Sequence, residues 1–248
     1  MKAASPAGRS GIEAVIFDWG GTLTPWHDID FAAEARALAA AVARVDGAEH
    51  TEEQTAAHAE RLGAAGNTVW GRSRDEQVSA MIADLFTEAG LDHDEEHLHH
   101  YRGFWEPHTF TDPQVEPLWR WLREQGIAVG VLSNTIWPRE WHRDFFERDG
   151  VLHLIDGDVY SSEIAWTKPS PHAFRAAMDA VGAGDPARCV YVGDRLYDDV
   201  WGAQQAGLRA VHIPHSAIPD VQRGHTEGTP DAVAHELADL RDIVARWM

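Results

Sequence analysis

The sequence predicts an α/β protein with a Rossmann-like core built on a parallel sheet and an all-helical cap inserted into that core. Continuous apolar runs, rather than alternating apolar and polar residues, are typical of strands buried on both faces, as in parallel sheets. These runs alternate with helical patterns, which is the order of βαβ units. A long stretch between the first two runs has helical patterns and no convincing strand, so it predicts an inserted helical unit.

Five apolar runs mark the expected strands. They lie at residues 12–17, 127–132, 151–160, 189–192 and 209–213, and the third is the weakest. The segment "VEPLWRWLREQG" before the second run is a helical pattern that ends on Gly126, because glycine readily adopts the left-handed conformation at a helix end. Ser170 and Pro171 stand in the order of a helix N-cap and a first helical residue. A terminal helix is expected around residues 232–246.

The inserted stretch shows two amphipathic helical faces. One face is formed by Phe31, Leu38, Val42 and Val45, and the other by Val78, Met81, Ile82, Leu85 and Phe86. This spacing places apolar side chains on one side of a helix. Ser73 with Glu76 three residues later predicts a capping box for the second helix. We expect a helical cap at residues 28–110, a core formed by residues 11–27 and 111–248, and a loose tail at residues 1–10.

The composition argues against several classes of function. The 248 residues suit one large domain or a domain with an insert. The 40 acidic and 21 basic residues give a formal net charge of −19, which argues against binding to nucleic acids or anionic membranes. The single cysteine, Cys189, excludes an intrachain disulfide, and no apolar run approaches the length of a membrane span. Because the N-terminus lacks the apolar core of a signal peptide, we expect a cytoplasmic protein.

Polar side chains follow four of the apolar runs. They are Asp18 after the first run, Ser133, Asn134 and Thr135 after the second, Lys168 in the loop after the third, and Asp194, Asp198 and Asp199 after the fourth. Ligands of open α/β sheets bind beyond the carboxyl ends of the strands, so we expect these groups to converge on one site. Lys168 is one of only two lysines in the chain, which indicates a position that requires a compact ammonium group.

Four segments occur in a family-specific order. They are "FDWGGTLT" at residues 17–24, "VLSNT" at 131–135, "TKPSP" at 167–171 and "VGDRLYDD" at 192–199. This set resembles the haloacid dehalogenase-like (HAD) hydrolase superfamily, in its phosphatase and phosphonatase-like branch, in which a helical cap follows the first motif. The resemblance covers residues 12–27 and 112–247, whereas the cap is similar only in being helical. Each motif alone is a weak signal, but four motifs in order indicate the family strongly.

The resemblance implies catalytic roles for four motif residues. Asp18 is expected to be the nucleophile that forms an aspartyl phosphate, and Thr22 is expected to orient it. Ser133 and Lys168 are expected to grip phosphoryl oxygens, with Lys168 stabilising charge in the transition state. The expected substrate-binding residues are Trp19, Gly20, Gly21 and Asn134, with backbone N–H groups of the turn at residues 19–21 cradling the phosphoryl group.

The resemblance also implies a magnesium site. An ionised carboxylate repels a phosphate dianion, and a divalent cation offsets that repulsion. Mg²⁺ takes oxygen ligands from a few carboxylates and keeps waters and substrate phosphate as its other ligands. The expected ligands are Asp18, the carbonyl of Gly20, Asp194 and Asp199, with Asp198 as the alternative to Asp199 because the two are adjacent.

Gly20 departs from the pattern of the related phosphatases, which carry an acid–base aspartate two residues after the nucleophile. Such acid–base help is worth roughly 10²–10⁴ in rate. The phosphonate-cleaving branch of the family lacks this aspartate but uses a cap lysine, and residues 28–110 contain none. Dehalogenases also lack it, and they dispense with the Gly-Asp pair that Gly193 and Asp194 preserve here. The ion-pumping ATPases, a third such branch, require membrane segments.

The expected function is therefore that of a Mg²⁺-dependent phosphatase acting on a small phosphorylated metabolite. The missing acid–base is expected to come from elsewhere, with His27 and the cap residue His58 as candidates, or the leaving group departs unprotonated. One alternative is a non-catalytic or weakly active member that binds a phosphorylated metabolite. A second alternative is a metal-independent haloacid dehalogenase.

Two further groups of residues admit two interpretations each. The segment "HDEEHLHH" at residues 93–100 places His93 and His97 on one helical face, a workable metal spacing, but a solvated helix face is the favoured interpretation. Trp19, Trp26 and Trp137 follow the first and second motifs, so they are expected either to line the substrate entrance or to pack between cap and core.

Overall fold

The computed structural model describes residues 11–25, 30–45, 51–72, 79–91, 95–214 and 227–248, without the side chains of residues 31, 41–45, 70–72 and 96. Six parallel strands form one sheet in the order β3-β2-β1-β4-β5-β6. Their bounds are β1 Ala14–Phe17, β2 Ala128–Ser133, β3 Gly157–Tyr160, β4 Cys189–Gly193, β5 Arg209–His212 and β6 Ala232–Val233. This parallel sheet with helices around it confirms the predicted α/β class.

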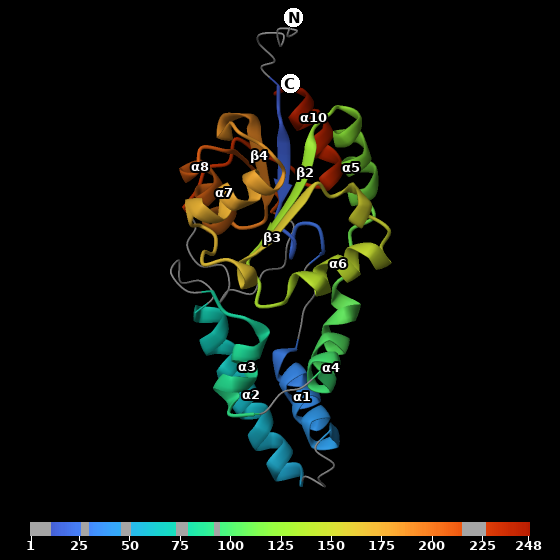
Figure 1. Cartoon of the computed structure of the whole chain (residues 1–248), viewed down its shortest axis with the longest axis vertical. Coiled ribbons are helices and arrows are strands. Elements are labelled where there is room, and N and C mark those ends of the chain that lie inside the picture. Colours follow the sequence, from blue (N-terminus) through green and yellow to red (C-terminus); the bar gives the residue numbers. More distant parts are fainter. Residues whose placement is uncertain (1–10, 26–29, 46–50, 73–78, 92–94, 215–226) are drawn as a thin grey trace, which may run out of the picture.

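The sheet is covered on both faces, which explains why its strands read as continuous apolar runs. Val15 and Phe17 of β1 pack into one core cluster, which includes residues of α5 and α10, while Ala14 and Ile16 pack into a second cluster with residues of α7. In Figure 1, α7 and α8 lie on one side of the sheet, and α5 and α10 lie on the other. Both faces of each central strand must therefore be apolar.

The remaining elements of the core follow the predicted alternation. The helices are α5 Val115–Glu124, α6 Arg139–Arg148, α7 Pro171–Ala180, α8 Gly202–Gln205 and α10 Leu240–Ala245, with a π-helix at Leu196–Trp201. Short 3₁₀ turns lie at Glu106–His108, Leu152–Leu154, Ser161–Glu163, Pro186–Arg188 and Leu237–Asp239. Two predicted helix ends are confirmed, because Ser170 Oγ accepts a bond from the His172 N–H and Gly126 has a φ of 74°.

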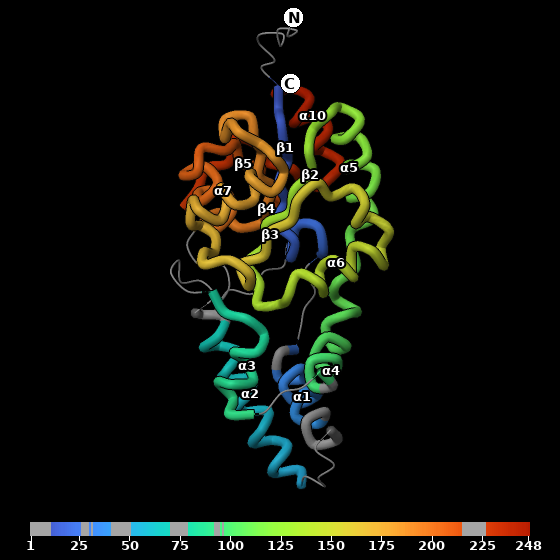
Figure 2. The backbone as a smooth tube through the Cα atoms, in the orientation of Figure 1, coloured from blue at the N-terminus to red at the C-terminus, as the bar shows by residue number. Residues whose placement is uncertain are grey.

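Four helices form the inserted unit. Their bounds are α1 Phe31–Val45, α2 Glu52–Arg72, α3 Ile82–Ala89 and α4 Glu95–Trp105. The chain leaves the core after the loop that follows β1, forms these helices and returns to the core before α5 (Figure 2). The helices lie beyond the carboxyl ends of the strands (Figure 1), where a ligand of this sheet would bind. Within the described chain, no helix has the length and apolar character needed to cross a membrane.

Three local expectations need correction or fall outside the described residues. The expected terminal helix at 232–246 is shorter, because Ala232–Val233 instead extends the sheet beside β5 as β6. Met81 was expected on a buried helix face, but it is the N-cap of α3 with extended backbone, and its side chain is 53% exposed. The predicted capping box of Ser73 and Glu76 lies outside the described residues.

Candidate active site

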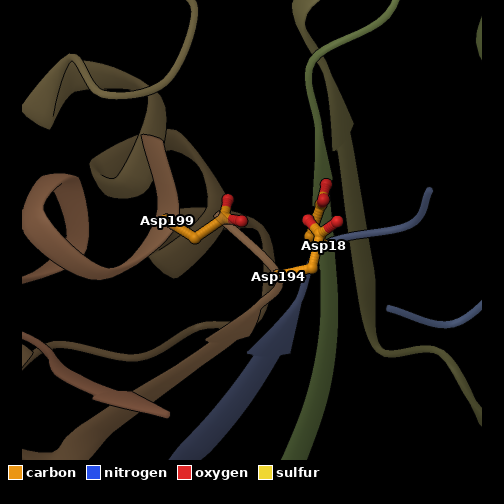
Figure 3. A group of neighbouring side chains, drawn as sticks. All are labelled: Asp18, Asp194 and Asp199. Carbon is orange, nitrogen blue, oxygen red and sulfur yellow. The ribbon is translucent and has the colours of Figure 1, made fainter. Parts of the chain in front are cut away.

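Three carboxylates meet at the carboxyl end of the sheet. Asp18 follows β1, Asp194 follows β4, and Asp199 lies in the π-helix after β4; all three side chains are buried. Each offers a carboxylate oxygen, and these oxygens lie within 4.8 Å of one another. Figure 3 shows the carboxylate of Asp199 turned toward the other two.

Strand register explains why residues so far apart in the sequence meet. Phe17 of β1 is the register partner of Val192 of β4, and the backbone N–H of Asp18 donates to the Val192 carbonyl at 2.9 Å. Asp18 is the first residue after β1, and Asp194 is the first after β4. Neighbouring parallel strands therefore deliver both carboxylates to the same edge, as the sequence predicted.

Lys168 links two of the three carboxylates. Its Nζ donates to Asp18 Oδ1 at 2.7 Å, to Asp199 Oδ1 at 2.6 Å and to the Tyr191 hydroxyl at 2.9 Å. Since an ammonium group has three N–H donors, all of its donors are used inside the protein. In this arrangement, the expected bond from Lys168 to a phosphoryl oxygen would require exchange of one of these three bonds.

Burial and mutual charge control the protonation of this site. Burial raises the pKa of Asp18 above its usual range, and Lys168 offsets part of that rise. Burial also raises the pKa of Asp194, and the charges of Asp18 and Asp199 raise it further. Burial alone would lower the pKa of Lys168, but Asp18 and Asp199 together raise it above its usual value. The lysine therefore stays charged, and the carboxylates carry an excess of negative charge.

Asn134 connects the loop after β2 to Lys168. Its side-chain amide donates to the Lys168 carbonyl at 3.0 Å, and its side-chain oxygen accepts the Lys168 backbone N–H at 2.8 Å. These two bonds hold the backbone from which the lysine side chain extends. Ser133, the last residue of β2, is buried at the same edge of the sheet. The expected substrate contact of Asn134 stays a prediction, whereas its contact with Lys168 is a positioning role.

Asp198 and Asp199 take different places although they are adjacent. Asp199 belongs to the carboxylate group, and its Oδ2 accepts the backbone N–H of Arg195 at 2.9 Å. Asp198 lies 3.5 Å from the guanidinium of Arg195 and outside that group. Gly193 makes room for Asp199, because a Cβ added at residue 193 would overlap the Asp199 carboxyl group. The sequence therefore needs glycine immediately before Asp194.

The loop after Asp18 is held by its own backbone. The carbonyl of Trp19 accepts the N–H groups of Leu23 and Thr24 at 2.9 and 3.0 Å, and the N–H of Gly21 donates to the Thr24 carbonyl at 2.7 Å. Gly21 adopts a φ of 83°, which glycine tolerates best. Because the Gly21 N–H already has an acceptor, it is not available to a substrate in this arrangement.

Gly20 and Thr22 both lie in this loop. A Cβ added at Gly20 would meet no atom within 4 Å, so the position facing away from the loop is open. The hydroxyl of Thr22 is buried and has no hydrogen-bond partner in the described part of the chain. Its expected role in orienting Asp18 stays a prediction.

An aromatic cluster includes Trp19, the residue that follows Asp18. Trp19 contacts Trp137, whose ring centroid lies 5.6 Å away, and His142, whose ring centroid lies 4.5 Å away. Burial lowers the pKa of His142 to about 3, so its ring is neutral and acts as a packing group. The cluster reaches the cap, because Trp137 Nε1 donates to the Tyr101 hydroxyl of α4 at 3.3 Å. Trp19 and Trp137 thus pack at the junction of cap and core, while Trp26 lies outside the described residues.

The histidine cluster of α4 does not form a metal site with other described residues. His97 is buried 6.4 Å from the ring of Phe86, inside the packing of the cap, and His93 lies outside the described residues. The group of Asp18, Asp194 and Asp199 is the one set of three or more potential ligands within the described ranges.

A comparison with protein-family models decides the family. Residues 12–207 match the model of the haloacid dehalogenase-like hydrolases, which is more than half of the chain. The chain belongs to this family. The match begins at β1 and ends just after α8, so it spans all the carboxylates of the site and Lys168.

Among characterised HAD relatives, several carry phosphatase names. The chain is 33% identical over 132 residues to glyceraldehyde 3-phosphate phosphatase of Methanopyrus kandleri, covering 53% of this chain and 55% of the relative. It is 30% identical over 131 residues to phosphoserine phosphatase of Thermus thermophilus, covering 53% and 49%. The chain thus spans about half the length of the curated relatives it matches.

Solved HAD structures share the whole fold. A HAD phosphatase from Thermococcus onnurineus superposes with a TM-score of 0.66 at 23% identity and covers 94% of this chain and 98% of the other. A 2-haloacid dehalogenase from Pseudomonas syringae pv. Tomato gives 0.63 at 24% identity and covers 96% and 100%. At these identities the similarity establishes the fold, including the helical insert, and not the reaction.

Two residues of the HAD site were missed by the sequence analysis. Tyr191 of β4 accepts a bond from Lys168 and donates its own hydroxyl to the Leu132 carbonyl at 2.9 Å. Arg195 is partly buried, and its positive charge lowers the pKa values of Asp18 and Asp194. Two features of the sequence could have identified these residues: a tyrosine hydroxyl lies within an apolar strand, and an arginine directly follows Asp194.

The donor set of the HAD site fits a divalent cation. Three buried carboxylates crowd within 4.8 Å, and burial raises the pKa values of Asp18 and Asp194, which repulsion between the carboxylates raises further and Lys168 only partly offsets. All three ligands are hard oxygen donors, which Mg²⁺ prefers. Gly193 provides the space that keeps Asp199 in this group.

Proposed function

We propose that this HAD hydrolase is a Mg²⁺-dependent phosphatase that acts on a small phosphorylated molecule, with Asp18 as the nucleophile. The observation that carries the proposal is the position of Asp18, whose carboxylate binds Lys168 at 2.7 Å and lies within 4.8 Å of Asp194 and Asp199. The phosphatase names of the relatives from Methanopyrus kandleri and Thermus thermophilus favour a phosphoryl substrate.

The metal in this proposal is held by carboxylates that have different duties. Asp18 and Asp194 are the direct ligands, together with the Gly20 carbonyl. Asp199 completes the set or supports it, because both of its oxygens already accept bonds from Lys168 and Arg195. When bound, Mg²⁺ offsets the repulsion between these carboxylates and the phosphate dianion.

In the first half-reaction, in which Asp18 attacks phosphorus, different residues of the chain have different roles. Lys168 binds Oδ1 of Asp18, which fixes the rotation of the carboxylate and leaves Oδ2 for attack on phosphorus. Ser133, at the end of β2, and the turn N–H groups of Trp19 and Gly20 contact phosphoryl oxygens. Asn134 holds the backbone of Lys168, so the ammonium charge stays beside the reacting group.

A chelator experiment tests the proposal. Purified protein is expected to release phosphate from an activated aryl phosphate when Mg²⁺ is present and to stop when the metal is chelated. Hydrolysis that continues undiminished in chelator would contradict the metal assignment and support the dehalogenase alternative, which a parallel assay with a 2-haloacid checks. Binding of phosphorylated metabolites without turnover would instead support the non-catalytic alternative.

A further inference from the structure

The core of the site offers no acid–base beside the nucleophile. Gly20 replaces the carboxylate of related phosphatases, and a side chain there would enter open space. The loop from Trp19 to Pro25 carries no ionisable side chain. Of the two carboxylates beside Asp18, Asp199 has both oxygens engaged by Lys168 and Arg195, and Asp194 is the proposed metal ligand. A proton donor for the leaving group must therefore come from outside this loop.

In-line attack identifies the side from which that donor must act. Asp18 attacks from the strand end, so the leaving-group oxygen lies on the opposite side of phosphorus. That side faces the inserted helices, which stand beyond the carboxyl ends of the strands (Figure 1). Water that later attacks the aspartyl phosphate also approaches from that side. A single cap residue can therefore serve both half-reactions.

Glu34 is a cap carboxyl with the environment of an acid–base. It lies in the first turn of α1, the first helix after the loop that carries Asp18. It accepts one hydrogen bond, from Trp105 Nε1 at 2.8 Å. Burial raises its pKa from 4.5 to about 7, and the bond from Trp105 offsets part of that rise. A carboxyl with such a pKa can both give and take a proton near neutral pH.

The surroundings of Glu34 connect it to the catalytic loop. The ring of Trp105 lies 5.4 Å from that of Trp137, and the ring of Trp137 lies 5.6 Å from that of Trp19, which directly follows Asp18. These rings form a continuous apolar wall from the nucleophile to the cap. Trp105, which donates to Glu34, is buried in this wall and contributes to the partial burial that raises the pKa of the carboxyl.

Other ionisable groups lie around Glu34. Burial raises the pKa of the Tyr101 phenol of α4, the charge of Glu34 raises it further, and the Tyr101 hydroxyl accepts a bond from Trp137 Nε1. Directly before α1, Asp30 accepts the N–H of Ala33 at 2.9 Å and pairs with Arg36 at 3.5 Å. Asp30 and Arg36 thus bind each other at the start of α1, whereas Glu34 faces Trp105.

We propose that Glu34 is the acid–base residue of this enzyme and replaces the carboxylate missing at Gly20. This inference rests on the proposed phosphatase function. In the first half-reaction, Asp18 forms a bond to phosphorus, the bond to the leaving oxygen breaks, and neutral Glu34 gives that oxygen its proton. In the second, ionised Glu34 takes a proton from water as water bonds to phosphorus. That proton regenerates neutral Glu34, and the bond from Asp18 to phosphorus breaks, which regenerates the Asp18 carboxylate and releases phosphate.

The test compares Glu34→Gln with Glu60→Gln, an exposed glutamate of α2 that serves as the matched control. The glutamine keeps the size of the side chain and the oxygen that accepts from Trp105. With glycerol phosphate and Mg²⁺, Glu34→Gln is expected to lose roughly 10²–10⁴ in rate, while Glu60→Gln keeps the wild-type rate. With an activated aryl phosphate, Glu34→Gln is expected to give a burst of leaving group followed by slow release.

A double variant and a measurement on the wild-type protein complete the test. Gly20→Asp added to Glu34→Gln is expected to restore part of the lost rate, because it returns a carboxylate to the open position. In the wild type, the phosphoenzyme is expected to decay faster as pH rises through about 7, where Glu34 becomes a base. This decay can be measured even if a variant does not fold.

The outcomes separate the two proposals. If Glu34→Gln behaves like Glu60→Gln, or if phosphoenzyme decay does not change across that pH range, then Glu34 is not the acid–base and the phosphatase proposal still stands. If the wild type shows no Mg²⁺-dependent hydrolysis of any phosphate, the phosphatase proposal fails and the role of Glu34 fails with it.

Discussion

The strand-end site and the junction of cap and core differ in how tightly each holds its ionisable side chain. At the strand ends, Lys168 makes three polar contacts with Asp18, Asp199 and Tyr191, so every ammonium donor is fixed. At the junction, aromatic rings fill the space, and Glu34 accepts a single bond from Trp105. A group with three partners is held in one charge state and one position. A partly buried carboxyl that accepts one hydrogen bond from the described residues can exchange a proton.

The largest expected effect on stability comes from removing the lysine at the strand ends. Lys168→Ala leaves Asp18 and Asp199 buried without their cation, which is expected to cost about 3–5 kcal/mol of stability and ~10²–10³ in kcat. Lys168→Arg is expected to restore little of the lost activity, because a planar guanidinium cannot make the three bonds that the compact ammonium donates. Thermal unfolding and phosphate release measure both effects. Full activity in folded Lys168→Ala would show that the strand-end contacts are dispensable.

A smaller effect is expected when the space behind Asp199 is filled. Gly193→Ala places a methyl group against the Asp199 carboxyl and is expected to destabilise the protein by about 1–3 kcal/mol while reducing activity. Gly184→Ala is the matched control, since a Cβ there meets no atom within 4 Å, and its effect should stay within about 0.5 kcal/mol. Equal stability of the two variants would contradict the tight fit around Asp199.

The cap junction predicts a pH-dependent difference in stability. Because folding raises the pKa of Glu34 from 4.5 to about 7, the folded state binds more protons between these values, and stability is lost as pH rises through that window. Relative to Glu34→Gln, the wild type is expected to lose about 1–3 kcal/mol between pH 4.5 and 8. Denaturant unfolding of both proteins at several pH values gives the difference. If the difference in the free energy of unfolding between the two proteins did not change with pH, Glu34 would be in contact with water.

The smallest effect is expected at Gly20. Since a Cβ there meets open space, Gly20→Ala should change the free energy of unfolding by no more than about 0.5 kcal/mol. The open space at the Cβ position also makes Gly20→Asp a usable variant. Strong destabilisation of Gly20→Ala, seen by thermal unfolding, would mean that the open position is closed in solution.

The two regions also differ in what the sequence could reveal. The strands, the convergence of Asp18, Lys168 and Asp194, and the family follow from apolar runs that end in polar residues, because parallel strands align their carboxyl ends. β6 was missed because two residues carry too little periodicity to separate a strand from a helix. The environment of Glu34 was missed because the burial that raises its pKa arises from packing between helices, and the packing of α4 on α1 brings Trp105, distant in sequence, beside it.

The most direct measurement is the mass of the protein quenched during turnover of an activated aryl phosphate with Mg²⁺. Peptide mapping is expected to find one phosphoryl group on Asp18, absent from Asp18→Asn and from protein treated with chelator. Asp18→Asn should keep the wild-type fold and lose at least ~10⁴ in rate. Turnover that persists in Asp18→Asn, or a phosphoryl group found on another residue, would contradict the assignment of Asp18 as the nucleophile.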